Sequence, residues 1–346
     1  ISAHGKSRPA HIVKSTKPYD IDCFEHVLTA NYSYPQPWYI EGEGFLFLHT
    51  SYDGGRKLYA QTSADGVTWS ERTFLAGIDE GHYQVSWAQG KRVGTAFNYH
   101  PKALNGNAER HGLNWRTNLY YIETDDMGRT WHTADGQGAA IPLETAHHSA
   151  LVYDYEAEDT LVYINDINFD KQGRPAILYV TGKSWEPGPR YGVREWKVAH
   201  WAGDAWAIHH VTTSDSNYDC GSLYIEPDNT WRIIGPTQTG PQPYNPGGEV
   251  AVWTSRDQGK TWTKRTQATT GSVFNHSYCR RPVNAHPGFY AFWADGHGRR
   301  PSESRLYFCD KTGRHVYRLP YTMDTDMAKP ERVSRRPGAR SPENVW

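Results

Sequence analysis

A short sequence motif, or phrase, that ends in Trp occurs three times along this chain of 346 residues. Two copies occupy eight residues each, 124–131 and 255–262, and a copy that is one residue shorter occupies 63–69. Each copy follows a run of residues typical of a β-strand, and another strand is predicted to begin at its Trp. One match could arise by chance, but three matches at the same place between strands indicate a repeat fold.

The residue types in the phrase suit a hairpin turn. Ser or Thr, and the Asp two positions later, can hydrogen-bond the turn's own backbone, while Gly supplies a positive φ and Trp packs between neighbouring sheets. This pattern resembles the Asp-box, or BNR repeat. The resemblance implies an all-β fold, a single β-propeller whose blades of four antiparallel strands surround a central channel.

The pattern of apolar runs and turns predicts about five such blades. The predicted strands are 38–40, 45–49, 57–62 and one from 69; 83–87, 93–99, 118–123 and one from 131; 161–167, 176–181, 196–201 and 206–210; one from 222, then 231–236, 249–254 and one from 262; one from 278, then 289–294, 305–309 and 316–319. Residues 150–155 are left as an extra strand. No linker interrupts the array, so we expect one catalytic domain over 1–346, with 329–346 as a tail or closing segment.

Composition agrees with this fold and limits the partners. Apolar residues make up only 37% of the chain while aromatic residues reach 14%, which suits short strands and an aromatic binding surface. The 37 basic and 38 acidic residues cancel to a net charge of -1, so no global field recruits nucleic acid or an acidic membrane surface. No apolar run is long enough to span a membrane as a helix. An anionic ligand would have to be recognised locally.

The chain begins at Ile1 without Met. This fits removal of a signal segment, and it fits equally a chain that was shortened in another way. We expect a secreted or periplasmic protein that acts as a monomer.

The order of strands in a propeller blade predicts where a binding site forms. The start of the first strand, the end of the second and the start of the third all lie at the same mouth of the channel. This rule gathers His49, His82, His100, Arg116, Tyr218, Asp219, His276, Tyr278, Arg280 and Arg281. A lone His at a strand end is more often a solvated or hydrogen-bonded structural residue. This chain has the high number of 17 histidines, however, and those that strand order places at the mouth cluster with arginines.

These residue types favour one kind of sugar chemistry. Glycoside hydrolysis normally uses two carboxylates, and the mouth clearly offers only Asp219. β-Elimination at a 4-linked uronic acid instead needs a cation to neutralise the carboxylate, a base to remove the C5 proton and an acid to protonate O4. Histidine suits the base or the acid, since its pKa lies near about 6.5, and tyrosine suits the acid or a relay.

Three stretches carry a closer resemblance. Residues 81–84 (Gly-His-Tyr-Gln), 97–101 (Phe-Asn-Tyr-His-Pro) and 117–121 (Thr-Asn-Leu-Tyr-Tyr), followed by an Asp-box, resemble the two-histidine blade of BNR-repeat polysaccharide lyases. These include the ulvan lyases and the L-rhamnose-α-1,4-D-glucuronate lyases and proposed rhamnosidases that act on gum arabic and arabinogalactan glycans. Similar stretches at 217–219, 240–242, 247–249 and 275–278 extend the resemblance through most of the chain.

The resemblance implies that His82 and His100 are a catalytic pair, one as the base and the other as the acid or the carboxylate-side partner. The partner implied is a uronic-acid-containing polysaccharide or oligosaccharide. Members of the family have seven blades, and some carry a calcium ion, so a structural Ca²⁺ is compatible with this chain while no cofactor is required. The other mouth residues are expected to bind substrate, with the arginines placed there by topology alone: His49, Arg116, Tyr218, His276, Tyr278, Arg280 and Arg281.

Two alternatives remain open at this point. A rhamnosidase that uses a single histidine, with His49 as the candidate, would hydrolyse the same glycans and leave no unsaturated uronate. A propeller that binds glycans without chemistry would use the same aromatic residues. A sialidase is disfavoured, because the chain has no Arg-Ile-Pro element.

Overall fold

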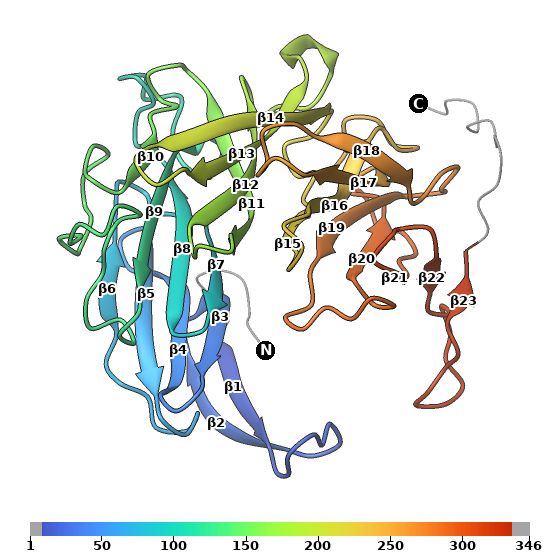
Figure 1. Cartoon of the computed structure of the whole chain (residues 1–346), viewed down its shortest axis with the longest axis horizontal. Coiled ribbons are helices and arrows are strands. Elements are labelled where there is room, and N and C mark those ends of the chain that lie inside the picture. The colour runs from blue at the N-terminus through green and yellow to red at the C-terminus, as the bar shows by residue number, and fades with distance from the viewer. Residues whose placement is uncertain (1–8, 334–346) are drawn as a thin grey trace. The chain divides into compact units, whose positions relative to one another are not determined.

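The computed structural model describes residues 9–333 (Figure 1). The chain divides into two compact units, Ile1–Ile167 and Asn168–Trp346, which are described in turn. In the described part, antiparallel strands make up nearly all the regular structure, and the helical segments are two short 3-10 turns, η1 (Leu113–Trp115) and η2 (Pro189–Tyr191). The all-β class predicted from the sequence is confirmed.

The first unit contains a hairpin and two sheets. Its strands are β1 (Ala10–Ser15), β2 (Phe24–Ala30), β3 (Ser33–Ile40), β4 (Gly44–Tyr52), β5 (Arg56–Ser63), β6 (Thr73–Ala76), β7 (Gln84–Gln89), β8 (Arg92–Tyr99), β9 (Thr117–Thr124), β10 (Leu151–Tyr153) and β11 (Leu161–Phe169), the last of which crosses into the second unit. β3 to β6 form a four-stranded antiparallel sheet in chain order, as Figure 1 shows in blue. β7, β8 and β9 follow one another in a second sheet. The β1–β2 hairpin was not predicted.

The core of the first unit lies between these two sheets. Side chains alternate along β4 so that Leu46 and Leu48 are buried, and they pack in one cluster with Phe97 of β8 and Ile122 of β9. The indole of Trp131, which ends an Asp-box, belongs to the same cluster. The two sheets of the first unit therefore share one apolar core.

The repeated phrase folds as the same turn in each copy. In residues 255–262, the Gly259 N–H donates to the Ser255 hydroxyl at 2.9 Å, and the Trp262 indole N–H donates to the Gly259 carbonyl at 2.9 Å. The Asp257 carboxylate accepts from the backbone N–H and the hydroxyl of the following threonine at 2.9 and 2.6 Å. The other two copies repeat the Gly and Trp bonds, and all three glycines have φ between 74° and 81°. The predicted turn chemistry is confirmed.

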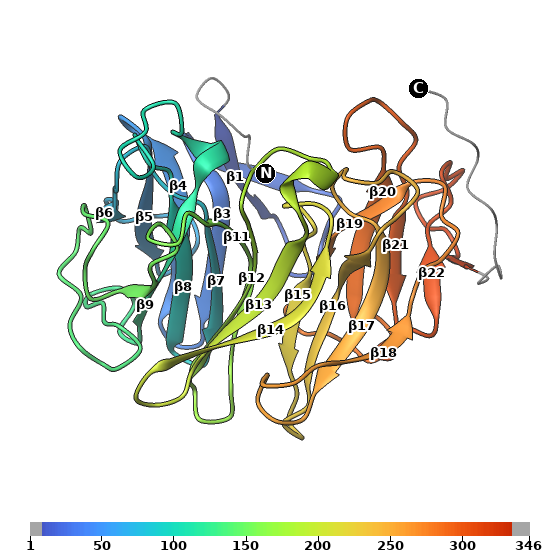
Figure 2. The same cartoon turned by 90° about the horizontal axis from the view of Figure 1, so that it is seen from above.

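The second unit is built from three groups of antiparallel strands. They are β12 (Pro175–Gly182), β13 (Arg194–Trp201) and β14 (Trp206–Ser214); β15 (Ser222–Ile225), β16 (Trp231–Gln238), β17 (Glu249–Ser255) and β18 (Thr263–Gln267); and β19 (Asn275–Arg280), β20 (Ala291–Gly296), β21 (Leu306–Cys309), β22 (Val316–Arg318) and β23 (Glu331–Arg332). Each group runs in chain order, and Figure 2 shows β16, β17 and β18 side by side. The four-stranded groups predicted for 222–262 and 278–319 are present.

Two details differ from the sequence-based expectation. No strand begins at Trp131; instead His132 makes an isolated antiparallel bridge with Glu123, and β10 supplies the fourth strand by pairing with β9. β23 adds a fifth strand to the last sheet and lies in the segment predicted as a tail or closing strand, of which 334–346 is outside the described residues. The single propeller over 1–346 and the seven blades stay predictions.

Within residues 9–333, no helix is long and apolar enough to cross a membrane.

Candidate functional site

Two buried arginines lie against a group of tyrosines in the first unit. The guanidinium carbons of Arg56 and Arg116 each lie 4.5 Å from the centre of the Tyr83 ring. Arg56 also lies over two further tyrosine rings at 4.9 and 5.0 Å, and Arg116 over another at 4.6 Å. This set, called the Arg–Tyr stack, consists of Tyr34, Tyr52, Arg56, Tyr83, Arg116 and Tyr163. Cation–π contacts of this kind fix the arginines without a carboxylate.

Backbone contacts at Gly81 bring the parts of the stack together. Arg56 and Gly81 form a parallel bridge, and the His82 N–H donates to the Arg56 carbonyl at 2.8 Å. The His100 N–H donates to the Gly81 carbonyl, also at 2.8 Å. Gly81 has a φ of 112°, and a Cβ atom there would lie 2.1 Å from the Arg56 carbonyl oxygen. Only glycine therefore permits this approach of β5 to the start of β7.

The charges around Tyr83 make its hydroxyl unusually acidic. Burial alone would raise the pKa of Tyr83, but Arg116 and Arg56 outweigh it, and the net pKa lies below the ordinary value of a tyrosine. Tyr34, which packs edge-on to Tyr83 at 5.1 Å, has its pKa raised by burial and then by the Tyr83 charge and hydrogen bond. Tyr83 is therefore the more acidic of the two and the better proton donor.

Arg56 is a buried cation, and two of its nitrogens make no hydrogen bond with the described residues. Its side chain is 2% exposed, and Nη2 donates to the Tyr52 hydroxyl. In the described part of the chain, its Nε and Nη1 have no hydrogen-bond partner. A buried charge normally has its donors satisfied. The Nε and Nη1 donors of Arg56 therefore lack the hydrogen bonds that a buried charge normally makes.

His100 is a neutral histidine beside this stack. Its ring centre lies 4.9 Å from that of Tyr83, its side chain is 3% exposed, and its Nε2 makes no hydrogen bond with any described residue. Burial, followed by the charges of Arg116, His82 and Arg56, holds the pKa of His100 well below its ordinary value. A buried, neutral imidazole with an unused nitrogen is able to accept a proton.

His82, the other predicted member of the catalytic pair, is hydrogen-bonded to the backbone through both ring nitrogens. Its Nδ1–H donates to the Asn98 carbonyl at 2.8 Å, and its Nε2 accepts from the Ile78 N–H at 3.0 Å. The side chain is fully buried, and burial lowers its pKa to about 4. Both ring nitrogens are therefore bonded to backbone groups, and His82 links the segment before β7 to the end of β8.

The sequence matches the BNR repeat-containing family over residues 1–214, more than half of the chain. The chain belongs to this BNR repeat-containing family. The match covers the stretch that carries the Arg–Tyr stack, His82 and His100. None of the curated proteins matches the sequence.

Solved structures resemble this BNR repeat protein in fold. An ulvan lyase of polysaccharide lyase family PL25 is 16% identical in sequence, with a TM-score of 0.66. The matched region covers 86% of this chain and 69% of the ulvan lyase chain. A PL25 ulvan lyase structure bound to -[GlcA(1-4)Rha3S]- is 17% identical with the same coverage and TM-score. The polysaccharide lyase Uly1 is 14% identical and covers 83% of this chain and 60% of its own, with a TM-score of 0.56. At these identities the likeness establishes the fold.

His49 lies in the first unit but has a different environment. Its side chain is fully buried, its Nε2 meets the Gln61 side-chain oxygen at 3.2 Å, and its ring packs against Tyr32 at 4.6 Å and stacks on Tyr59 at 5.8 Å. Burial lowers the pKa of His49 to about 3. These contacts enclose the ring in the β3–β6 sheet, so the structure gives it a packing role.

The remaining predicted site residues belong to the second unit. Tyr278 is 46% exposed and lies under the Arg280 guanidinium at 5.5 Å, while the Arg281 guanidinium lies 5.8 Å from the Tyr224 ring. Tyr218 is half-buried at the turn before β15. The substrate-binding roles of Tyr218, Tyr278, Arg280 and Arg281 stay predictions.

Asp219 and His276 are both buried. The Asp219 carboxylate accepts backbone N–H groups of Ser216 and Gly247 at 3.0 and 2.8 Å, and burial raises its pKa well above the ordinary value. His276 accepts the Trp293 indole N–H at its Nδ1 and meets the Ser272 hydroxyl at its Nε2. Asp219 thus fixes two loops, and His276 borders a separate cavity.

The sequence-based selection missed part of the Arg–Tyr stack. Arg56 opens the third strand of its sheet, so the rule that selected Arg116 selects Arg56 equally well. Tyr34 was missed because the first strand was predicted to begin at Trp38, whereas β3 begins at Ser33, and Tyr163 was missed because it lies within β11. Among residues 9–333, no three His, Cys, Asp or Glu side chains cluster closely enough to hold a metal ion. The structural calcium ion stays a prediction.

Proposed function

We propose that this BNR repeat protein is a polysaccharide lyase that cleaves 4-linked uronic acids by β-elimination. The observation that carries the proposal is His100, a buried and neutral histidine next to Tyr83 and two arginines, whose Nε2 has no hydrogen-bond partner among the described residues. A base, an acid and cations are the three groups that β-elimination requires.

Arg56 and Arg116 would neutralise the uronate carboxylate. The C5 proton of a uronate is weakly acidic while the carboxylate keeps its charge, because removal of the proton places a second negative charge beside it. A guanidinium donates charge-assisted hydrogen bonds to a carboxylate, and Nε and Nη1 of Arg56 are two donors that have no hydrogen-bond partner among the described residues. Since both arginines are buried, their charges act in a medium of low dielectric constant.

His100 and Tyr83 would then move the protons. His100 Nε2 takes the C5 proton, the electron pair forms the C4–C5 double bond, the C4–O4 bond breaks, and the Tyr83 hydroxyl donates its proton to O4. In a glucuronate ring, the C5 hydrogen and O4 lie on the same side, so the base and the acid must be neighbours. The 4.9 Å between the two ring centres meets this requirement. Return of the proton from His100 to Tyr83, directly or through solvent, restores the site.

The substrate class proposed is a glycan with L-rhamnose α-1,4-linked to D-glucuronate, as in gum arabic and arabinogalactan, or the related ulvan. The family resemblance of the sequence motifs includes lyases of the rhamnose linkage, and a PL25 ulvan lyase of similar fold was solved bound to -[GlcA(1-4)Rha3S]-. We further propose that the protein acts outside the cytoplasm, where such polysaccharides occur.

Product analysis tests the reaction class. The protein would be incubated separately with gum arabic and with ulvan, and the released sugars would be analysed by mass spectrometry. The proposal expects an uronate product that is lighter by one water molecule than the hydrolysis product. Free rhamnose with an intact, saturated glucuronate would instead assign a hydrolase, and binding without any release would assign a glycan-binding protein.

A further inference from the structure

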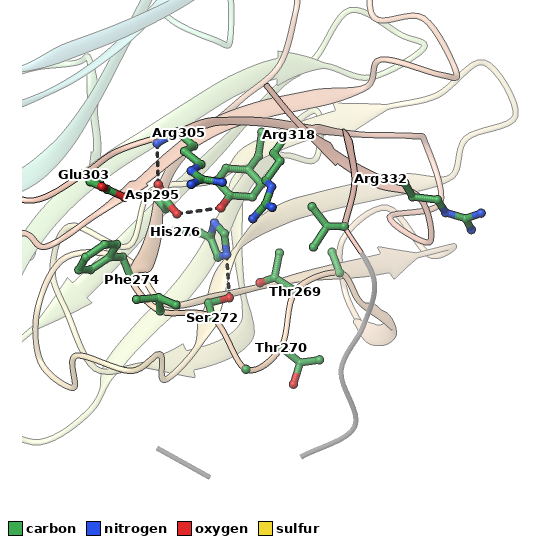
Figure 3. A pocket seen from close by; sticks show the side chains of 15 residues that line it. Thr269, Thr270, Ser272, Phe274, His276, Asp295, Glu303, Arg305, Arg318 and Arg332 are labelled. Atoms are coloured by element: carbon green, nitrogen blue, oxygen red, sulfur yellow. Dashed lines mark hydrogen bonds between the residues drawn. The ribbon is translucent and has the colours of Figure 1, made fainter. Parts of the chain in front are cut away.

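A cavity in the second unit is lined by charged side chains that the proposed reaction does not use. Its volume is about 450 Å³, and ligand pockets commonly measure about 300–1,000 Å³. One wall is a face of the last sheet, β19 to β23, and another is formed by residues 268–274, which connect β18 to β19. Figure 3 shows the side chains that line it. The cavity therefore has the size of a ligand site.

Strand register gathers five of these side chains on one face of the sheet. His276 pairs with Asp295 across β19 and β20, and Tyr307 pairs with Arg318 across β21 and β22. Arg305 precedes Tyr307 by two residues and so points to the same face. In Figure 3, Arg305 and Arg318 lie at the same end of the cavity, close to Asp295 and His276.

The carboxylate beside Arg305 does not pair with its guanidinium. Asp295 Oδ1 accepts from the backbone N–H of Arg305 at 2.7 Å, and Oδ2 accepts from the Tyr307 hydroxyl at 2.8 Å. The carboxylate therefore fixes β21 and does not neutralise the guanidinium. In the part of the chain that the structure describes, the Arg305 guanidinium makes no hydrogen bond or ion pair, and its aromatic neighbour is the Tyr321 ring at 5.9 Å.

The other walls are held in place by bonds within the unit. Arg318 Nε donates to Glu331 at 2.9 Å, which keeps a second guanidinium at the cavity. Ser272 donates its backbone N–H and its hydroxyl to the Glu249 carboxylate, each at 2.9 Å, and its hydroxyl oxygen meets His276 Nε2 at 2.8 Å. The loop over the sheet is thus fixed before any ligand arrives.

We propose that this cavity is a second carbohydrate site, which takes a sugar residue bearing a carboxylate or a sulfate ester. The planar guanidinium of Arg305 can donate two parallel hydrogen bonds to either anion. The Phe274 ring and the hydroxyls of Thr270 and Ser272, which also line the cavity, suit the faces and hydroxyls of a sugar. The choice of an acidic sugar over another anion rests on the proposed function, since a second contact with the same polysaccharide raises its apparent affinity.

The indole N–H of Trp293 provides a local probe. It donates to His276 Nδ1 at 2.9 Å, and the Trp293 ring stacks on Tyr307 at 6.1 Å, so a ligand in the cavity should shift its NMR signal. The whole chain would carry His100→Ala to prevent turnover and ¹⁵N-labelled tryptophan, and Trp293→Phe would assign the signal. The ligands are a rhamnosyl-glucuronate oligosaccharide, its glucuronate methyl ester, a sulfated form of that ester, and inorganic sulfate.

We expect a saturable shift of the Trp293 signal with the acidic oligosaccharides, and at least tenfold weaker binding in Arg305→Gln. Arg314→Gln, an exposed arginine that does not line the cavity, should leave this affinity unchanged. Comparison of the free-acid oligosaccharide with the sulfated methyl ester shows whether the carboxylate or the sulfate ester is the group that binds. An unmoved Trp293 signal, the same affinity in Arg305→Gln, or equal affinity for inorganic sulfate would overturn the proposal.

Cleavage by the same variants separates this proposal from the proposed function. Arg305→Gln in the otherwise unchanged chain should cleave a short substrate within about twofold of the unsubstituted protein. If no substrate is cleaved but the Trp293 signal still shifts with acidic sugars, the lyase assignment fails and the second site stands. If cleavage occurs and the signal never shifts, the second site fails alone.

Discussion

The guanidinium carbon of Arg116 lies 4.5 Å from the centre of the Tyr83 ring, and that of Arg56 lies at the same distance from the same ring. Two positive charges beside one phenol stabilise its ionised form, and they do so against the opposing effect of burial. The same charges act with burial to keep His100 neutral. One pair of arginines thereby favours the two protonation changes that the proposed reaction needs, at neighbouring side chains.

Replacement of Arg56 tests the neutralisation of the uronate carboxylate. Arg56→Met removes the unused Nε and Nη1 donors, and we expect kcat/KM to fall by about 10²-fold or more, with Arg56→Lys recovering part of the loss. Steady-state kinetics on an acidic oligosaccharide measure this. Arg129→Met, which changes an exposed arginine of an Asp-box turn, is the matched control and should retain full activity. Equal activity in Arg56→Met and the control would refute the role of Arg56.

The pH dependence of kcat/KM should be broad on the acid side. His100 acts in its neutral form, and its pKa is held well below the usual value of about 6.5, so activity should persist as pH falls through 6. Tyr83 acts in its protonated form, and its pKa lies below the ordinary tyrosine value, so activity should be lost on the alkaline side below about pH 10. A profile that falls with a midpoint near 6.5 would contradict the assignment of His100.

His82→Ala should act mainly on stability. The change leaves the Ile78 N–H and the Asn98 carbonyl buried without their partner, and we expect a loss of about 1–3 kcal/mol in the free energy of unfolding. Denaturant titration monitored by tryptophan fluorescence measures it. If His82→Ala removed turnover while the unfolding midpoint stayed in place, His82 would have to take part in the chemistry.

Asp257→Ala should weaken the turn of the Asp-box. The carboxylate accepts hydrogen bonds from Ser255 and Thr261, and its loss should reduce the free energy of unfolding by about 1–3 kcal/mol. Burial raises the pKa of Asp257, but these hydrogen bonds outweigh it and bring the value to about 2. Since the folded pKa is lowered, the contribution is present above pH 4 and is lost as pH falls towards 2. Acid titrations of the two proteins should therefore converge at low pH.

The sequence predicted the fold through its turns. The Ser255, Asp257, Gly259 and Trp262 types each have a local role, so the Asp-box could be read without tertiary information. The strand after Trp131 was predicted wrongly because β10, which completes that sheet, comes about twenty residues later in the chain. Its pairing depends on contacts that the local pattern does not encode.

The candidate site was predictable in part. Strand order placed His100 and Arg116 at one mouth, and the structure brings both to Tyr83. The same rule does not predict that both ring nitrogens of His82 are hydrogen-bonded to backbone groups. These bonds depend on the path of the chain at Ile78 and Asn98. Identical residue types at strand ends thus acquire different roles from their local bonds.

The most direct test of the central claim is the ultraviolet absorbance of a conjugated unsaturated uronate, followed after mixing the protein with a rhamnosyl-glucuronate polysaccharide. The account predicts a steady rise that His100→Ala and Tyr83→Phe each slow by about 10²- to 10⁴-fold while the fold remains intact. Cleavage of the polysaccharide without any rise in absorbance, or an unchanged rise in His100→Ala, would contradict it.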